Sequence, residues 1–196
     1  MRLKTEIWVQ AYLRRWFAQG GFGAVLSKGA AEAGAVYVVV NSGMSWTVAQ
    51  SIYEKVIRAL QSHGRVGAVF GHRGKVRAIK YVWRHRHRLH DEFIASSNPV
   101  GFCEALPWIG PTTKWHLAKD LGVDVAKPDV HLARLACRDR TTVARLCQRL
   151  ARQTGYRVAT VDTLLWRACA TGILNSRAYE LHGWRAAFHG RPKIKH

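Results

Sequence analysis

Residues 106–134 read LPWIGPTTKWHLAKDLGVDVAKPDVHLAR, and this stretch decides the fold. Pro107 and Gly110 bracket a tight turn between two helical patterns, and a glycine lets the backbone approach a partner closely. Pro111 suits the first turn of the following helix, whose free amide groups attract anions. Asp129 then stands at a capping position of a further helix. The stretch therefore predicts a backbone clamp for phosphate, with a carboxylate just beyond the second helix of the clamp.

The turn and the segment after it resemble a known superfamily of enzymes. The pattern L-P-x-I-G-P-x-T followed by K-P-D-x-H-L-x-R is similar to the helix-hairpin-helix DNA glycosylases, which include endonuclease III, the adenine glycosylase of mismatch repair and the 3-methyladenine glycosylases. The resemblance is strongest over residues 102–136. It implies an all-α fold of two helical lobes. Residues 41–135 would form the lobe that contains the hairpin, and residues 1–40 with 136–196 would form the other.

The charge balance points to a polyanionic partner. The 196 residues include 31 Lys and Arg against 12 Asp and Glu, a formal net charge of +19. Hydrophobic residues make up 48%, which is enough for a packed core. An excess of this size exceeds the needs of a solvated surface, so nucleic acid is the first candidate and an anionic membrane is the weaker one. We expect double-stranded DNA as the partner of a monomer.

The distribution of apolar residues and cysteines limits the other classes. No apolar run approaches the roughly 20 residues of a membrane span, and the N-terminal residues lack the apolar core of a secretory signal. We therefore expect a cytoplasmic, nucleoid-associated protein. The cysteines are scattered and form no C-x-x-C pair, so we expect no metal site, no disulfide framework and no iron–sulfur cluster of the kind that some endonuclease III relatives carry. Each is expected to be a small core residue: Cys103, Cys147, Cys169 and Cys137.

Hydrophobic spacing predicts helices on both sides of the hairpin. The segment 36–40 is β-branched and could be a strand, although the resemblance makes it a buried helix, so the first forty residues could hold some β structure. The basic run 84–90 is expected either on a solvated helix face or against DNA phosphates. The last residues, 171–196, are glycine-broken and basic and are expected to end as a loose tail. The predicted helices are Leu3–Trp16, Trp46–Leu60 capped by Ser45, Lys75–Trp83, Thr141–Gln153 capped by Thr141 or Thr142, and Arg157–Ala170.

Asp129 is the expected catalytic residue, because it matches the catalytic aspartate of the superfamily. Cleavage of the bond between a base and its deoxyribose requires the base to leave the stack, and it leaves positive charge on the sugar. A carboxylate beside that carbon stabilises the charge and can orient the attacking water. A plain helix cap is the alternative role of Asp129, and the two roles are compatible. Asp162, in Val161-Asp162-Thr163, is a rival by pattern, but we interpret it as structural because no hairpin precedes it.

The position two residues past the final glycine of the hairpin separates hydrolases from lyases in this superfamily. Lyase-active members place a lysine where this chain has Thr112, so the resemblance favours a monofunctional hydrolase. Lys114 and Lys127 are expected to contact phosphate, and a lyase that uses one of them is a less favoured reading.

Further residues are expected around the DNA and the active site. Pro107, Trp108, Gly110, Thr112 and Thr113 belong to the DNA-binding turn. The loop position of Met44 matches a wedge that fills the gap left by a flipped base, although a buried methionine is equally compatible. Support for the active site is expected from His131, Trp115 and His116.

These expectations combine into one function with one alternative. The sequence predicts a monofunctional DNA glycosylase of base excision repair that hydrolyses the N-glycosidic bond of a damaged or modified base without metal or organic cofactor. An alkylated purine is slightly favoured, because it already carries positive charge and leaves without a strong general acid. The alternative is a non-catalytic helix-hairpin-helix protein that binds DNA, although such a module has no need for a carboxylate that repels phosphate.

Overall fold

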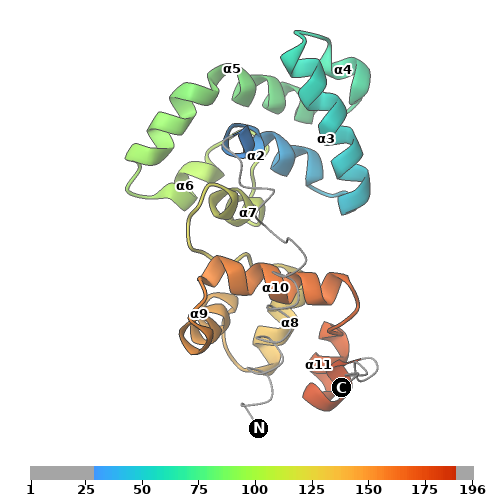
Figure 1. Cartoon of the computed structure of the whole chain (residues 1–196), viewed down its shortest axis with the longest axis vertical. Helices are drawn as coiled ribbons and strands as arrows, with labels where there is room; N and C mark the ends of the chain where they lie inside the picture. The colour runs from blue at the N-terminus through green and yellow to red at the C-terminus, as the bar shows by residue number, and fades with distance from the viewer. Residues whose placement is uncertain (1–28, 189–196) are drawn as a thin grey trace, which may run out of the picture. The chain divides into compact units, whose positions relative to one another are not determined.

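The computed structural model describes residues 29–188, and all regular secondary structure within this range is helical (Figure 1). The all-α class is therefore confirmed for this range, whereas the predicted helix Leu3–Trp16 lies outside it. None of the described helices is both long and apolar enough to cross a membrane. The helices are α2 (Gly29–Asn41), α3 (Trp46–Gln61), α4 (Val66–Val69), α5 (Arg73–Ala95), α6 (Pro99–Glu104), α7 (Thr113–Asp120), α8 (Val130–Arg138), α9 (Val143–Thr154), α10 (Val158–Ala170), α11 (Ser176–His182) and α12 (Trp184–Ala187).

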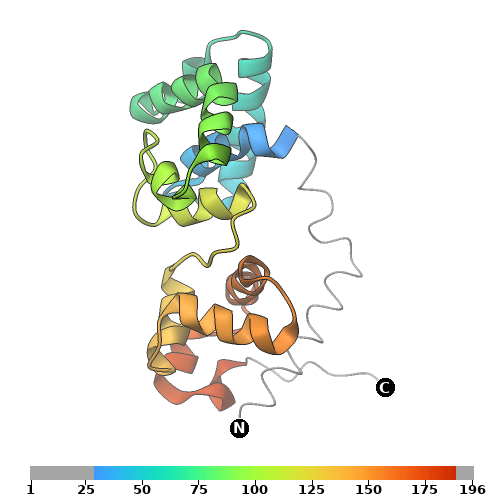
Figure 2. The same cartoon turned by 90° about the vertical axis from the view of Figure 1, so that its left-hand side faces the viewer.

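The described chain forms two compact units, which Figures 1 and 2 draw from two sides. Residues 29–123 make the first, called here the hairpin unit, and residues 124–188 make the C-terminal unit. These boundaries differ from the expected lobes at both ends. Residues 29–40 pack with the hairpin unit because α2 contacts α3, α5 and α7. Residues 124–135 belong to the C-terminal unit because α8 packs on α9, α10 and α11.

The hairpin unit is built around α2. Val36, Val38, Val39 and Val40 are at most 1% exposed, so this segment is surrounded by other helices. Figures 1 and 2 show α2 against α5 and α7. The β-branched run is a helix rather than the strand that it could have been, because tertiary burial outweighs an intrinsic preference of well under 1 kcal/mol per residue.

Lys75 is a buried cation that joins two helices of this unit. It lies in the first turn of α5 and is 4% exposed. Its Nζ donates hydrogen bonds to the carbonyl oxygens of Val40, at 3.0 Å, and Ser42, at 2.5 Å, where α2 ends. The ammonium thus satisfies carbonyl groups that the end of the helix leaves unpaired. Burial lowers the pKa of Lys75 below its ordinary value.

Other helix boundaries in this unit differ from the sequence expectation. The helix α5 is one continuous element that extends past the predicted Lys75–Trp83 and takes in the basic run 84–90, for which a helix face is one of the two predicted roles. Ser45 stands at the expected cap position of α3, but its side chain makes no capping hydrogen bond.

The C-terminal unit packs its helices around Leu132, Leu146, Leu150, Val161 and Leu174, among other buried residues. The ends of α9 follow the sequence prediction. Thr142 accepts a hydrogen bond from the Arg145 amide at 3.2 Å, and Gly155 ends the helix with a φ of 74°.

Within the glycine-broken basic segment, residues 176–187 form α11 and α12. The loose tail predicted for the last residues falls on residues 189–196, which lie outside the described range. Cys103, Cys147 and Cys169 are buried as expected, but Cys137 is exposed on α8.

Candidate functional site

The turn between α6 and α7 is tightly hydrogen-bonded and apolar at its base. Leu106 and Ile109 are 9% and 6% exposed, and the Ile109 amide donates to the Leu106 carbonyl at 3.1 Å. The Gly110 carbonyl accepts a hydrogen bond from the Lys114 amide at 3.0 Å, which opens α7. The predicted turn between two helices is therefore present, and its buried residues hold it against the hairpin unit.

The free amides of this turn belong to the start of the helix that follows it. The Gly110 amide donates to Thr113 Oγ1 at 2.8 Å, so it is already paired within the turn. Pro111 has no amide hydrogen. The amides of Thr112 and Thr113 donate to no acceptor within residues 29–188, and Thr112 is exposed. An anion at the start of α7 would therefore meet the two threonine amides rather than the Gly110 amide.

Trp108 is held in an unusual conformation on the surface of the turn. Its φ is 68°, a left-handed value that costs energy for a bulky residue, and 46% of the residue is exposed. The indole ring lies 5.0 Å from the His72 ring, edge to face. A β carbon at Gly74 would lie 2.6 Å from Trp108 Cζ3, so only glycine fits beneath the indole. The sequence did not predict that His72 and Gly74 contact Trp108, although a glycine in the first turn of a helix is a signal of close approach.

The other predicted residues of the hairpin unit have local partners. Lys114 Nζ lies 2.6 Å from Glu104 Oε2 and 5.6 Å from the centroid of the Trp115 ring. His116 contacts the Tyr37 ring at 6.2 Å, and its Nε2 lies 3.5 Å from an Asp120 carboxylate oxygen. These contacts pair the lysine with a carboxylate and turn the histidine toward neighbouring helices.

Met44 lies in the loop between α2 and α3. It is half-buried, and its amide donates to the Asn41 carbonyl at 3.0 Å. The side chain is thus neither fully buried nor fully exposed, so both predicted roles remain predictions.

Asp129 caps α8 with one carboxylate oxygen and leaves the other available. Oδ1 accepts hydrogen bonds from the amides of His131 and Leu132, both at 2.9 Å. Oδ2 has no hydrogen-bond partner among the described residues. Among the described residues, every buried side-chain oxygen or nitrogen has a hydrogen-bond partner. Because Oδ2 has none, it is not buried and is accessible. The predicted capping position is confirmed, and the geometry gives the carboxylate a fixed orientation with one free oxygen.

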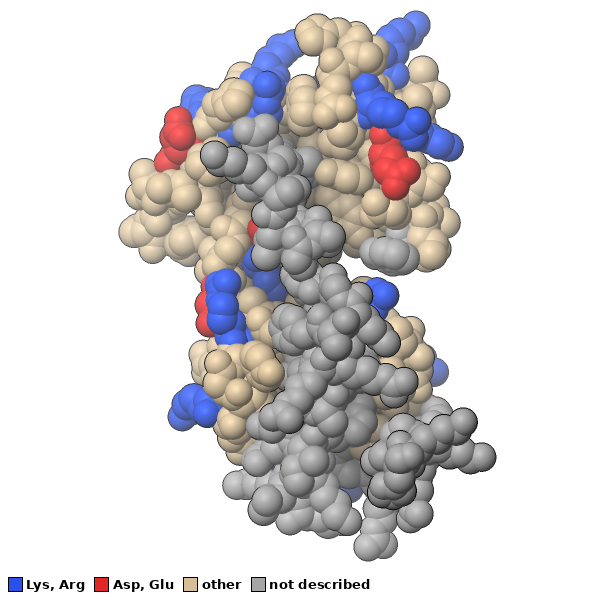
Figure 3. Space-filling model, in the orientation of Figure 1, with Lys and Arg blue, Asp and Glu red and all other residues tan. Residues whose placement is uncertain are grey.

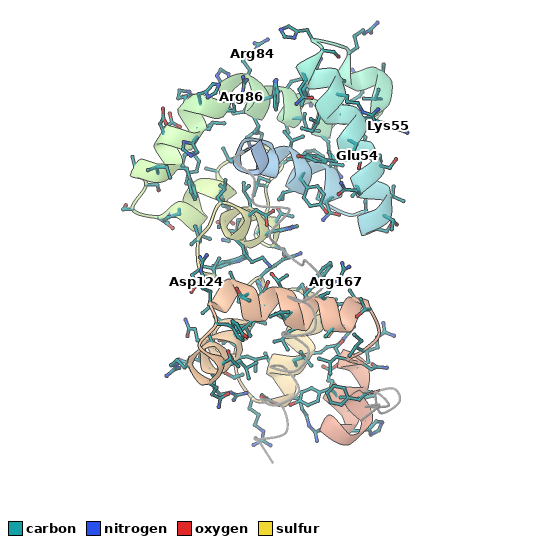
Figure 4. The ribbon with its side chains drawn as sticks, in the orientation of Figure 1. Glu54, Lys55, Arg84, Arg86, Asp124 and Arg167 are labelled. Carbon is teal, nitrogen blue, oxygen red and sulfur yellow. The ribbon has the colours of Figure 1, made fainter. Side chains whose placement is uncertain are left out.

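Two further aspartates fasten the segment that leads to Asp129. Asp162 is 2% exposed on α10, and its Oδ1 accepts a hydrogen bond from the Lys127 amide at 2.9 Å. Asp124 Oδ1 accepts from the Ala159 amide at 2.9 Å and therefore caps the start of α10, where Figure 4 labels it. The structural interpretation of Asp162 is supported, with a backbone amide among its partners. The loop before α8 is thus anchored to α10 at both ends.

Buried groups surround the start of α8. His131 Nδ1 lies 3.0 Å from Ser176 Oγ, and Ser176 is 3% exposed at the start of α11. Burial raises the pKa of Cys169 to about 12, with a further contribution from the negative charge of Asp129, while Arg134 acts in the opposite sense. No pattern in the sequence predicts that Ser176 or Cys169 lies near the start of α8. Arg134, in contrast, ends the K-P-D-x-H-L-x-R pattern itself.

This arrangement does not form a serine-hydrolase triad. Asp129 Oδ1 binds the backbone amide of His131, which leaves the imidazole ring to Ser176. Ser176 is buried, so its hydroxyl is not presented to a substrate. The accessible reactive group at the start of α8 is the Asp129 carboxylate, which can stabilise a cation or accept a proton from water.

Comparison with known proteins gives one partial match. Residues 3–86 match the model of a family described as a protein of unknown function (DUF1491). The match covers less than half of the chain and ends within α5, before the hairpin and Asp129. No curated protein and no solved structure matches the chain.

Proposed function

We propose that this protein is a monofunctional DNA glycosylase that hydrolyses the N-glycosidic bond of a damaged or modified base in duplex DNA. The observation that carries the proposal is the Asp129 carboxylate, with Oδ1 fixed by two amides and an accessible Oδ2. A carboxylate held in one orientation is suited to stabilising the positive sugar that forms as the base departs.

The fixed carboxylate also separates the proposal from a binding-only role. A negative charge at an accessible position repels phosphate, so a module that only binds DNA gains nothing from it. In a hydrolase the same charge has two uses. It stabilises the oxocarbenium-like sugar, and it accepts a proton from the water that attacks the sugar carbon. The bond to the base breaks with its electron pair leaving on the base, and the attacking water supplies the new bond to the sugar.

The contacts of Lys114 support a hydrolase rather than a lyase. Its Nζ is paired with the Glu104 carboxylate at 2.6 Å, so the amine is engaged in an ion pair rather than presented to a sugar carbon. Thr112, at the position where lyases of the superfamily carry the amine, offers no nitrogen for an imine. Water is therefore the proposed nucleophile.

A panel of duplex oligonucleotides tests this proposal. Each duplex carries one lesion, including alkylated purines, and is incubated with protein before hot alkali cleaves any abasic site. We expect cleavage of at least one lesion duplex, dependent on alkali, and no protein–DNA adduct when borohydride is added during turnover. Binding to every duplex without base release would support the non-catalytic alternative. A trapped adduct would contradict the monofunctional assignment and direct attention to Lys114 and Lys127.

A further inference from the structure

We propose that α5 carries a second DNA contact, a straight row of four cations that binds the phosphate backbone of one strand of a duplex. The row consists of Arg73, Arg77, Lys80 and Arg84 and is called here the α5 row. It shares duplex DNA as partner with the proposed function. Its residues are not those of the hairpin turn and do not include Asp129, and nothing in the resemblance assigns them.

The spacing of the α5 row places its members on one face of the helix. Steps of four, three and four residues follow the helical repeat, so the four side chains fall within a sector of about 60°. All four are exposed, whereas Ile79, Val82 and Leu89 on the opposite side are buried. At about 1.5 Å per residue the row is about 16 Å long. A row of this length can contact several neighbouring phosphates of one DNA strand.

The side chains of the row have no partner among residues 29–188. None of these four side chains makes a hydrogen bond, ion pair or ring contact with another residue of that range. Other arginines on the same helix are engaged. Arg86 lies 4.7 Å from the Trp83 ring and donates to the Trp83 carbonyl at 2.8 Å, and Arg88 pairs with Glu92 at 3.1 Å. The basic run 84–90, which looked uniform in the sequence, is therefore divided between engaged and free cations.

The surface around the row keeps the same sign of charge until the end of the helix. Figure 3 shows Lys and Arg atoms along the outer side of α5 and acidic atoms only at one end of it. The acidic residues of α5 are Asp91 and Glu92, in its last two turns. Free cations without nearby carboxylates keep their full charge for a partner, and this favours release of counterions from a polyanion.

A rigid row favours duplex DNA over the other polyanions. The apolar face of α5 is packed into the hairpin unit, so this helix has no apolar face to insert into a lipid bilayer. A helix of 23 residues fixes its cations in a line, as the backbone of a duplex fixes its phosphates. The exposed indole of Trp108 lies over Gly74, at the first turn of the same helix. An aromatic side chain beside the row adds a group that can pack against sugar or base.

The test compares two double variants that remove the same charge. Arg77→Gln with Arg84→Gln neutralises half of the α5 row. Lys55→Gln with Arg58→Gln neutralises two exposed cations on α3, where Figure 4 labels Lys55. Glutamine has a helix propensity close to those of lysine and arginine, so both variants should keep the helical circular dichroism of the parent. Binding of an undamaged 20-base-pair duplex is measured from low to physiological salt.

Each phosphate contact contributes about 0.9 to the slope of log affinity against log salt. We expect the α5 double variant to reduce the magnitude of that slope by about 2 and the α3 variant to leave it nearly unchanged. Equal reductions in both variants would contradict the row and indicate diffuse attraction by net charge. An unchanged slope for the α5 variant would also contradict the row. So would an α5 variant that keeps its duplex binding and loses only its binding to anionic vesicles. This binding experiment does not measure base release, so its result is independent of the result of the lesion panel.

Discussion

Asp162 offers a sharp test of how the C-terminal unit positions Asp129. Replacing Asp162 with alanine removes the acceptor of the Lys127 amide at 2.9 Å, in a site that is 2% exposed. Hydrogen bonds to charged groups contribute about 1.5–3 kcal/mol to stability. For a unit of this size each kcal/mol corresponds to about 4–8 °C, so we expect the Asp162→Ala unit to melt about 6–24 °C lower.

The assay is scanning calorimetry of the whole chain, together with amide exchange of Lys127 measured by NMR. Asp162→Asn is the matched control, because its amide oxygen can still accept the Lys127 hydrogen bond. It should melt above the alanine variant and retain base release. An alanine variant that melts with the parent would refute the reasoning that this bond holds the loop. A folded Asp162→Asn protein without base release would show that the rival carboxylate is the catalytic one.

Three further predictions follow from buried and exposed groups. Burial, and to a smaller extent the hydrogen bond with Asp139, raises the pKa of Tyr179 above its ordinary value of 10.0. Below pH 10.0 the tyrosine is therefore protonated in both the folded and the unfolded protein. Above it only the unfolded state ionises, so urea titrations from about pH 9 to 11 should show falling stability, and Tyr179→Phe should make that fall smaller. One thiol per chain should react rapidly with a disulfide reagent, and Cys137→Ser should remove that phase, because the other cysteines are buried. Finally, Lys75→Ala should cost about 1–3 kcal/mol in urea denaturation by leaving the Val40 carbonyl without its donor; parental stability would contradict this role.

The sequence predicted those helix ends and helix positions that depend only on neighbouring residues. Asp129 and Thr142 stand at the predicted caps, and Gly155 ends α9 in the left-handed conformation. A short polar side chain at a cap acts through the next few amides, so its role follows from the neighbouring residues alone. The amphipathic pattern of α3 likewise gave its position to within one residue.

Features that depend on distant parts of the chain were not predictable. The run 36–40 becomes a buried helix because α3, α5 and α7 surround it, and its own residues left the choice open. The pairing of the Gly110 amide with Thr113 Oγ1 depends on a side-chain rotamer, which the sequence does not specify. The role of Asp162 depends on a contact with Lys127, 35 residues away in the chain.

Base release by Asp129 variants tests the central claim most directly. Asp129→Asn keeps a side-chain oxygen for the amides of His131 and Leu132, so the cap and the fold should persist. Asp129→Ala loses the cap and should cost about 0.5–2 kcal/mol of stability. We expect both variants to release the base at least about 100-fold more slowly on the lesion duplex that the parent cleaves. Duplex binding by the asparagine variant should be equal or tighter, because a negative charge has been removed. Near-parental base release by a folded Asp129→Asn protein would contradict the assignment of this carboxylate.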